Sequence, residues 1–290
     1  MQLRYETTWR PAGLFLRGWR RFGRVALLYV VMSIIAVAFA LPLIWMAGAS
    51  LKPAAEVTQI PPTFIPRNPQ WHNYVQVLQT IPRFFGNSLL LAVLNVVGLL
   101  FFSSLAAYGF ARLQFWGRDL AFAILLSTAM IPSIVYLIPQ YILFRQIGWI
   151  DTYYPLVVPR VLTPVFATFL LRQFFLTLPL EIEDAAKIDG ASVFGIYWRI
   201  MLPQVKPALA AVGIFTFLES WNDLFGPLIF LNSIAKETLP VMLALYHGQF
   251  FTQTNLLMGA ATVTIIPILI VFLIGQKYFV RGIALTGLKG

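Results

Sequence analysis

The chain has 290 residues, of which 59% are hydrophobic and 11% are charged, and its formal net charge is +10. A soluble globular domain is roughly a quarter charged, so this composition predicts a membrane protein. The sequence has no cysteine and only two histidines, His72 and His247, which excludes disulfides and thiolate metal sites, and we expect neither a metal nor a cofactor in this chain.

Six blocks of apolar residues are each long enough for a helix that crosses about 30 Å of hydrocarbon. They cover residues 25–49, 87–111, 120–144, 153–176, 207–231 and 256–279. We therefore predict an all-α polytopic membrane protein with six transmembrane helices over residues 25–279. Prolines within the last four blocks indicate kinked helices around a cavity.

Residues 1–24 form a basic N-terminal segment with interleaved aromatic residues, which suits the headgroup region of a membrane. The first apolar block contains Ala38-Phe39-Ala40, a pattern of small residues similar to a signal-peptide cleavage site. The apolar run continues to Ala47, however, and this length favours a retained transmembrane helix.

The distribution of lysine and arginine predicts the orientation. Six spans place both termini on one side of the membrane, and 15 of the 21 basic residues lie on that side. Because cytoplasmic loops carry the excess of basic residues, we expect both termini, including the tail 280–290, in the cytoplasm. The charge therefore reflects topology and anionic lipid, and nucleic-acid binding is not expected.

Residues 50–86 are predicted as the longest external loop. The segment contains six prolines, and it could contact a partner outside the membrane.

The cytoplasmic segment 177–203 predicts a helix, a turn and a second helix. Acidic residues Glu181, Glu183 and Asp184 favour a helix N-terminus. Gly190 can adopt the left-handed conformation that ends the first helix, and Ser192 can cap the second. Pro203 is expected to stop the second helix. Such a knob suits docking into a groove on another protein, and the alternative is a solvated connection between two spans.

The same segment resembles the EAA loop of binding-protein-dependent ATP-binding-cassette importers. The resemblance lies in Asp184-Ala185-Ala186, Gly190 and Ile200-x-Leu202-Pro203, with Asp184 where that family has glutamate and with Glu183 just before it. It is closest to the second permease of maltose-type carbohydrate-uptake importers. Further similar segments are Asn87-Ser88, Leu171–Phe175, Ser220–Asp223, Pro240-Val241 and the C-terminal end.

This resemblance implies a permease that works in a heterodimer with a second permease, two ATPase subunits and an extracytoplasmic solute-binding protein. The chain would then be no enzyme, which agrees with the absence of a phosphate-binding G-x-x-x-x-G-K-[ST] loop. The substrate implied is a sugar, with an oligosaccharide first and a sugar-derived anion such as a glycerol phosphate or an acidic saccharide as the alternative. A secondary transporter is a more remote reading, since neither an inverted repeat nor a proton relay is evident.

The resemblance also implies which residues would couple the permease to its ATPase. They are Glu183, Asp184, Ala185, Ala186, Asp189, Gly190, Ile200, Leu202 and Pro203. Whether Glu183 or Asp184 makes the contact stays open, because the shorter aspartate replaces the glutamate of the family.

Four polar residues within the predicted spans are candidates for the transport pathway: Arg160, Glu219, Asn222 and Asp223. Ionisable residues inside a membrane usually face a partner or a cavity. Glu219 and Asp223 share one face of the fifth helix. Arg160 could therefore pair with either carboxylate and hold two helices together, or these residues could contact the substrate.

Overall fold

The computed structural model describes residues 13–249 and 253–287, and the side chains of residues 23–245 and 253–276. Residues 1–12 of the predicted N-terminal segment and 288–290 of the predicted tail lie outside this range. The described part of the chain contains helices and no β-strand, which confirms the all-α prediction. The helices are α1 (Gly13–Ser50), α2 (Ala54–Val57), α3 (His72–Arg112), α4 (Arg118–Thr128), α5 (Ser133–Gln146), α6 (Tyr154–Leu162), α7 (Val165–Leu176), α8 (Glu181–Ile188), α9 (Val193–Ile196), the π-helical turn η1 (Tyr197–Met201), α10 (Leu202–Gln204), α11 (Lys206–Trp221), α12 (Phe225–Phe230), the 3-10 turn η2 (Ile234–Lys236), α13 (Leu239–Gln249) and α14 (Thr254–Gly287).

The described part of the chain has four to six candidate membrane spans, and two of these are more strongly bent than the sequence predicts. In the described part of the chain four helical stretches are long and apolar enough to cross a membrane: Gly23–Ser50, His72–Arg112, Tyr154–Leu176 and Thr254–Gln276. Two further pairs count only as bent spans, α4 with α5 at 94°, and residues 193–204 with α11 at 79°. The count is therefore four, or up to six.

Two predicted spans are interrupted for identifiable reasons. The block 120–144 breaks between α4 and α5 just before Pro132, whose ring disfavours helical geometry in the preceding residue. The block 207–231 breaks after Trp221, where two polar side chains form hydrogen bonds with backbone groups. Asn222 Nδ2 donates to the Leu218 carbonyl at 2.8 Å, and Asp223 Oδ1 accepts from the Gly226 N–H at 3.0 Å.

Helix α3 is longer than predicted. It begins at His72 rather than near Asn87 and has 41 residues, which corresponds to roughly 60 Å at about 1.5 Å per residue. The predicted external loop 50–86 is therefore helical in its second part. The added turns contain polar residues such as Gln76 and Gln79, so hydropathy alone does not detect this helix.

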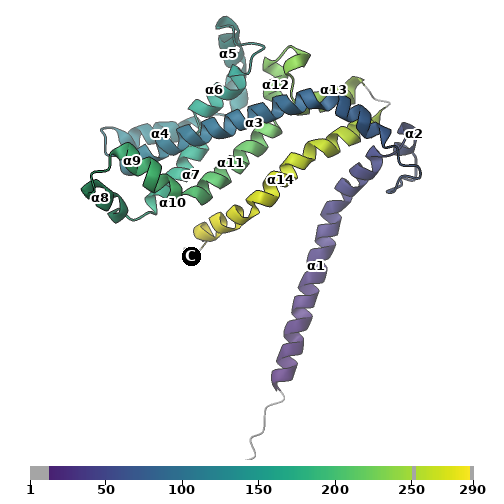
Figure 1. Cartoon of the computed structure of the whole chain (residues 1–290), viewed down its shortest axis with the longest axis horizontal. Helices are drawn as coiled ribbons and strands as arrows, with labels where there is room; N and C mark the ends of the chain where they lie inside the picture. The colour runs from purple at the N-terminus through teal and green to yellow at the C-terminus, as the bar shows by residue number, and fades with distance from the viewer. Residues whose placement is uncertain (1–12, 250–252, 288–290) are drawn as a thin grey trace, which may run out of the picture.

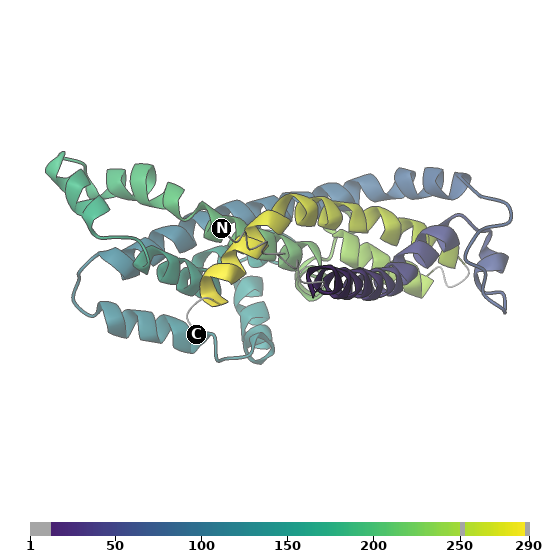
Figure 2. The same cartoon turned by 90° about the horizontal axis from the view of Figure 1, so that it is seen from below.

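Helix α3 also organises the molecule, as Figures 1 and 2 show. It runs the length of the body, with α8, α9 and α10 at its Arg112 end and α2 and α13 at its His72 end (Figure 1). Helices α7 and α11 pack along it, and α6 and α14 contact it as well. Helix α1 contacts α14 but projects away from the body (Figure 1).

Buried apolar residues form clusters at both ends of α3. One cluster lies at the Arg112 end and joins α3 and α7 to the segment 186–212, with Phe175, Tyr197 and Met201 among its members. A second cluster, around Trp221 and Leu239, lies toward the His72 end and includes Val77. The segment 181–204, which we call the knob, is thus packed onto one end of the bundle.

Candidate functional site

The knob is a helix, a turn and a second helix, as the sequence predicts. Gly190 has φ +78° and ends α8. The Ala191 N–H donates to the Ala186 carbonyl at 2.9 Å, and the Gly190 N–H donates to the Lys187 carbonyl at 3.0 Å. These two bonds form a Schellman motif, in which glycine takes the left-handed position. The Ser192 hydroxyl then caps α9 by accepting from the Gly195 N–H at 3.2 Å.

Pro203 does not stop the second helix, contrary to the prediction. It lies within α10, and the helical run continues to Gln204 before the chain bends into α11. The preceding turn is π-helical, and the Leu202 N–H donates to the Tyr197 carbonyl five residues earlier. A wider turn moves the carbonyl with which the proline ring would otherwise clash, so the helix tolerates Pro203.

One face of the knob is anchored to the bundle. Glu183 is buried, with 4% of its surface exposed, and its Oε1 lies 3.2 Å from Nε of Arg112 at the end of α3. The two atoms are at ion-pair distance without hydrogen-bond alignment. Arg112 Nη2 also donates to the carbonyls of Phe175 and Leu178, each at 2.5 Å. One guanidinium thereby joins α3, the end of α7 and α8.

A second anchor is aromatic. The Tyr197 hydroxyl and Ser104 Oγ share a hydrogen bond of 2.8 Å. The Tyr197 ring lies 5.3 Å from that of Tyr108, which is in edge contact with Phe175. Ile196 and Tyr197 are both buried, whereas the adjacent Trp198 is exposed.

The opposite face of the knob is open. The Asp184 side chain is 64% exposed and pairs with Lys187 of the same helix, at 3.1 Å. Beside it the knob exposes large apolar side chains, and Phe194 stacks on Trp198 with a ring distance of 6.2 Å. The exposed apolar residues are Ile188, Val193, Phe194 and Trp198.

The nine predicted coupling residues divide between these two faces. Glu183 and Ala186 are buried, and Ile200 and Leu202 pack against the apolar cluster. Asp184, Ala185, Asp189, Gly190 and Pro203 are exposed. Glu183 therefore belongs to the anchored face and Asp184 to the open face.

Of the four candidates for the transport pathway, Arg160 and Asp223 form an ion pair, which is one of the two pairs that the sequence predicts. Arg160 Nη2 lies 3.3 Å from Asp223 Oδ2, which joins α6 to the break after α11. Glu219 is exposed in the single chain and does not pair with Arg160, and Asn222 is also exposed. The structure thus brings Arg160 and Asp223 together and leaves Glu219 and Asn222 on an open surface.

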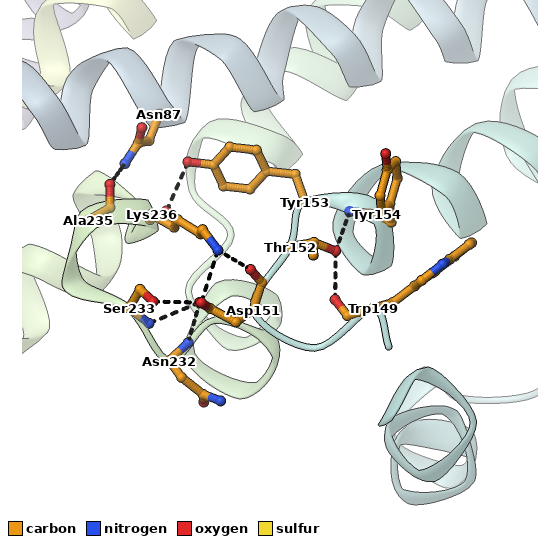
Figure 3. A network of polar contacts seen from close by, with 10 residues as sticks. All are labelled: Asn87, Trp149, Asp151, Thr152, Tyr153, Tyr154, Asn232, Ser233, Ala235 and Lys236. Atoms are coloured by element: carbon orange, nitrogen blue, oxygen red, sulfur yellow. Dashed lines mark hydrogen bonds and ion pairs between the residues drawn. The ribbon is translucent and has the colours of Figure 1, made fainter. Parts of the chain in front are cut away.

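Figure 3 shows a polar network near the other end of α3 that sequence reasoning did not find. Asp151, in the turn between α5 and α6, accepts from the N–H groups of Asn232 and Ser233 and pairs with Lys236 at 2.9 Å. The hydrogen bonds from Ser233, followed by that from Lys236, hold the pKa of Asp151 far below its usual range. The sequence gives little signal for such a network, because its members are far apart in the chain and are individually ordinary loop residues.

Arg112 is the other functional residue that sequence reasoning missed. In the sequence, Arg112 appears only as one of the basic residues near the end of a predicted span. Its pairing with Glu183 depends on the parallel packing of α3 and α7, which brings the C-terminal ends of both helices together and which no local pattern reveals. In the described part of the chain no group of three or more histidine, aspartate or glutamate side chains could hold a metal ion.

Comparison with known proteins places this geometry in context. Residues 99–285 match the family described as the binding-protein-dependent transport system inner membrane component. The chain is 34% identical over 269 residues to the arabinooligosaccharides transport system permease protein of Halalkalibacterium halodurans, covering 91% of this chain and 96% of that one. It is 32% identical to the sulfoquinovosyl glycerol transport system permease protein of Agrobacterium fabrum, covering 93% and 95%.

A solved structure has a similar fold. It is described as a bacterial ABC transporter involved in the import of the acidic polysaccharide alginate. One of its chains superposes with a TM-score of 0.77 at 27% identity, covering 91% of this chain and 98% of that chain.

Proposed function

Since this chain belongs to the family of inner membrane components of binding-protein-dependent transport systems, we propose that it is one permease subunit of an ATP-driven sugar importer in a bacterial cytoplasmic membrane. It translocates the sugar and hydrolyses nothing itself. Both termini lie in the cytoplasm, because that side carries most of the lysine and arginine. The knob then projects into the cytoplasm.

The open face of the knob docks onto an ATPase subunit. It combines the exposed carboxylate of Asp184 with the apolar side chains of Ile188, Phe194 and Trp198. A specific protein–protein interface usually has an apolar core, in which aromatic residues are enriched, and a polar rim. Glu183 is already paired with Arg112, which supports Asp184 as the carboxylate that reaches the ATPase.

A second permease subunit packs against α1. None of the residues 23–48 of α1 is buried in this chain, and the helix projects away from the body (Figure 1). A helix that leaves its own bundle gains little from its own chain, so its natural partner is another subunit. The two permeases, two ATPase subunits and an extracytoplasmic binding protein make up the importer.

The substrate is a neutral oligosaccharide rather than an acidic one. Asp223 neutralises Arg160, the one basic residue among the pathway candidates. The remaining candidates, Glu219 and Asn222, are exposed, and they can hydrogen-bond hydroxyl groups, while the carboxylate of Glu219 repels anions. The arabinooligosaccharide relative supports this choice, whereas the sulfoquinovosyl glycerol and alginate systems represent the acidic alternative.

The single observation that carries the proposal is the division of the knob into an anchored and an open face. The test is to co-express the chain with the products of its neighbouring genes and to purify the assembly in detergent. We expect a complex whose ATPase rate rises when the sugar-loaded binding protein is added. A chain that purifies alone and transports without ATP would overturn the proposal.

A further inference from the structure

Helix α3 is attached at its C-terminal end to the knob through a buried side chain that contacts three groups. Arg112 is buried, and its guanidinium contacts Glu183 of α8 together with the carbonyls of Phe175 and Leu178. Arginine offers several donors in a rigid planar fork. A displacement of α8 therefore acts directly on the end of α3.

About seven helical turns before Arg112, α3 is attached in a comparable way to the segment 232–239. Asn87 Nδ2 donates to the carbonyls of Ala235 and Glu237 at 3.0 and 2.8 Å. The buried hydroxyl of Ser88 accepts from the Leu239 N–H at 2.9 Å. Three backbone groups of this segment thus depend on two adjacent residues of α3.

The segment 232–239 is tied in turn to the start of α6. Lys236 pairs with Asp151, and the Tyr153 hydroxyl donates to the Lys236 carbonyl at 3.2 Å (Figure 3). Movement of α3 therefore reaches the turn before α6 as well as the segment before α13.

Between its two attachments α3 has no hinge. The stretch from Asn87 to Arg112 is continuous α-helix without proline, since Pro82 lies before it. At about 1.5 Å per residue it spans roughly 37 Å. Gly98 brings α3 so close to α6 that an added Cβ would lie 2.8 Å from Val161 Cγ2, so the rod is also packed tightly at its middle.

We infer that α3 is the mechanical link between the ATPase side and the binding-protein side of this subunit, and that Arg112 and Asn87 are the positioning residues at the two ends of its stretch 87–112. The inference rests on the proposed function. Binding-protein contact at segment 232–239 would move α3 through Asn87, and Arg112 would pass that movement to the knob.

The test measures how strongly the loaded binding protein stimulates the ATPase of the purified complex, as the ratio of the rates with and without it. Arg112→Lys keeps the charge but not the fork, and Asn87→Ala removes the donor. We expect each to lower the ratio at least threefold per assembled complex. Arg118→Ala, which breaks the exposed Arg118–Asp119 pair, is the matched control and should leave the ratio unchanged.

The double variant separates a link from two independent defects. Sites this far apart normally contribute additively, so independent effects would multiply in Arg112→Lys/Asn87→Ala. If both residues act through the same link, breaking it at a second point should not lower the stimulation ratio further. We therefore expect the ratio of the double variant to equal that of the more strongly affected single variant. Multiplied losses, or unchanged ratios in both single variants, would overturn the inference.

Failed assembly of a variant and a failure of the proposed function are both distinguishable from a failure of this inference. If Arg112→Lys does not assemble, Glu183→Gln takes its place with the same expectations, because it retains the shape of the side chain and one acceptor oxygen but removes the charge that pairs with Arg112. A wild-type complex without stimulation would refute the proposed function itself, before any variant is measured.

Discussion

The side chains of Arg112 and Glu183 form a buried ion pair that joins the end of α3 to the first turn of α8, with 3.2 Å between Nε and Oε1. Both side chains are at most 5% exposed. Removing one partner of a buried pair leaves an uncompensated charge and costs about 3–5 kcal/mol. The pair is therefore expected to govern the stability of the knob.

Arg112→Ala should accordingly destabilise the protein strongly. We expect a loss on the order of 3 kcal/mol, seen as a clear drop of the melting temperature in detergent. Arg118→Ala is the control, because its partner Asp119 is exposed and a surface pair contributes about 0–1 kcal/mol. Equal melting temperatures for the two variants would contradict the role of the buried pair.

Gly190 offers a prediction about backbone conformation alone. Its φ is +78°, and an added Cβ would meet no atom within 4 Å. Gly190→Ala should therefore cost about 1 kcal/mol from the left-handed backbone and nothing from crowding. Asparagine tolerates this conformation better, so Gly190→Asn should be milder and Gly190→Val more severe. Melting curves that rank the three variants in another order would count against the Schellman turn.

The Arg160–Asp223 pair should act as a structural contact between two helices. Arg160→Ala leaves Asp223 unpaired, and we expect a lower melting temperature and less protein in the membrane. Adding Asp223→Ala removes the unpaired charge, so the double variant should recover part of the stability. Transport of the sugar that stimulates the wild-type complex should recover with it. A double variant as unstable as the single one would show that the two residues do not act together.

Asp151 gives a prediction about pH. Because its pKa is lowered in the folded protein, the carboxylate contributes stability above its unfolded value of 3.8, and this contribution is lost only as the pH falls toward the lower folded value. The difference in melting temperature between wild type and Asp151→Asn should be about 2–4 °C. It should stay constant from pH 8 to pH 5 and shrink below about pH 4.

The matched control for this measurement is Asp119→Asn, whose side chain is 78% exposed. It should show little difference from wild type at any pH. A difference for Asp151→Asn that shrinks already between pH 7 and pH 5 would contradict the assigned network.

The sequence predicts the local features of this protein well. Gly190 and Ser192 take the turn and cap roles that their chemistry favours, and each of the six apolar blocks overlaps a helix or a bent helix pair that is a candidate membrane span. It fails where polar side chains compete with the helix, as at Asn222 and Asp223, and where hydropathy is used to find a helix end, as at His72.

The candidate site is predictable only in part for a related reason. The motif places Glu183 and Asp184 side by side, and adjacent residues on a helix point in different directions. Which of them is buried depends on where Arg112 lies, and that is set by the packing of α3 against α7. Contacts between distant segments, including Asp151 with Lys236, follow from tertiary structure and leave no local pattern.

The central claim is that the open face of the knob contacts the ATPase subunit, and cross-linking tests it most directly. The chain has no cysteine, so a single cysteine introduced at position 183, 184 or 188 is the only thiol that this subunit contributes to the assembled complex. We predict that Asp184→Cys and Ile188→Cys cross-link to the ATPase with a short bifunctional reagent, while Glu183→Cys does not. A complex that assembles but cross-links from neither Asp184→Cys nor Ile188→Cys would contradict the account.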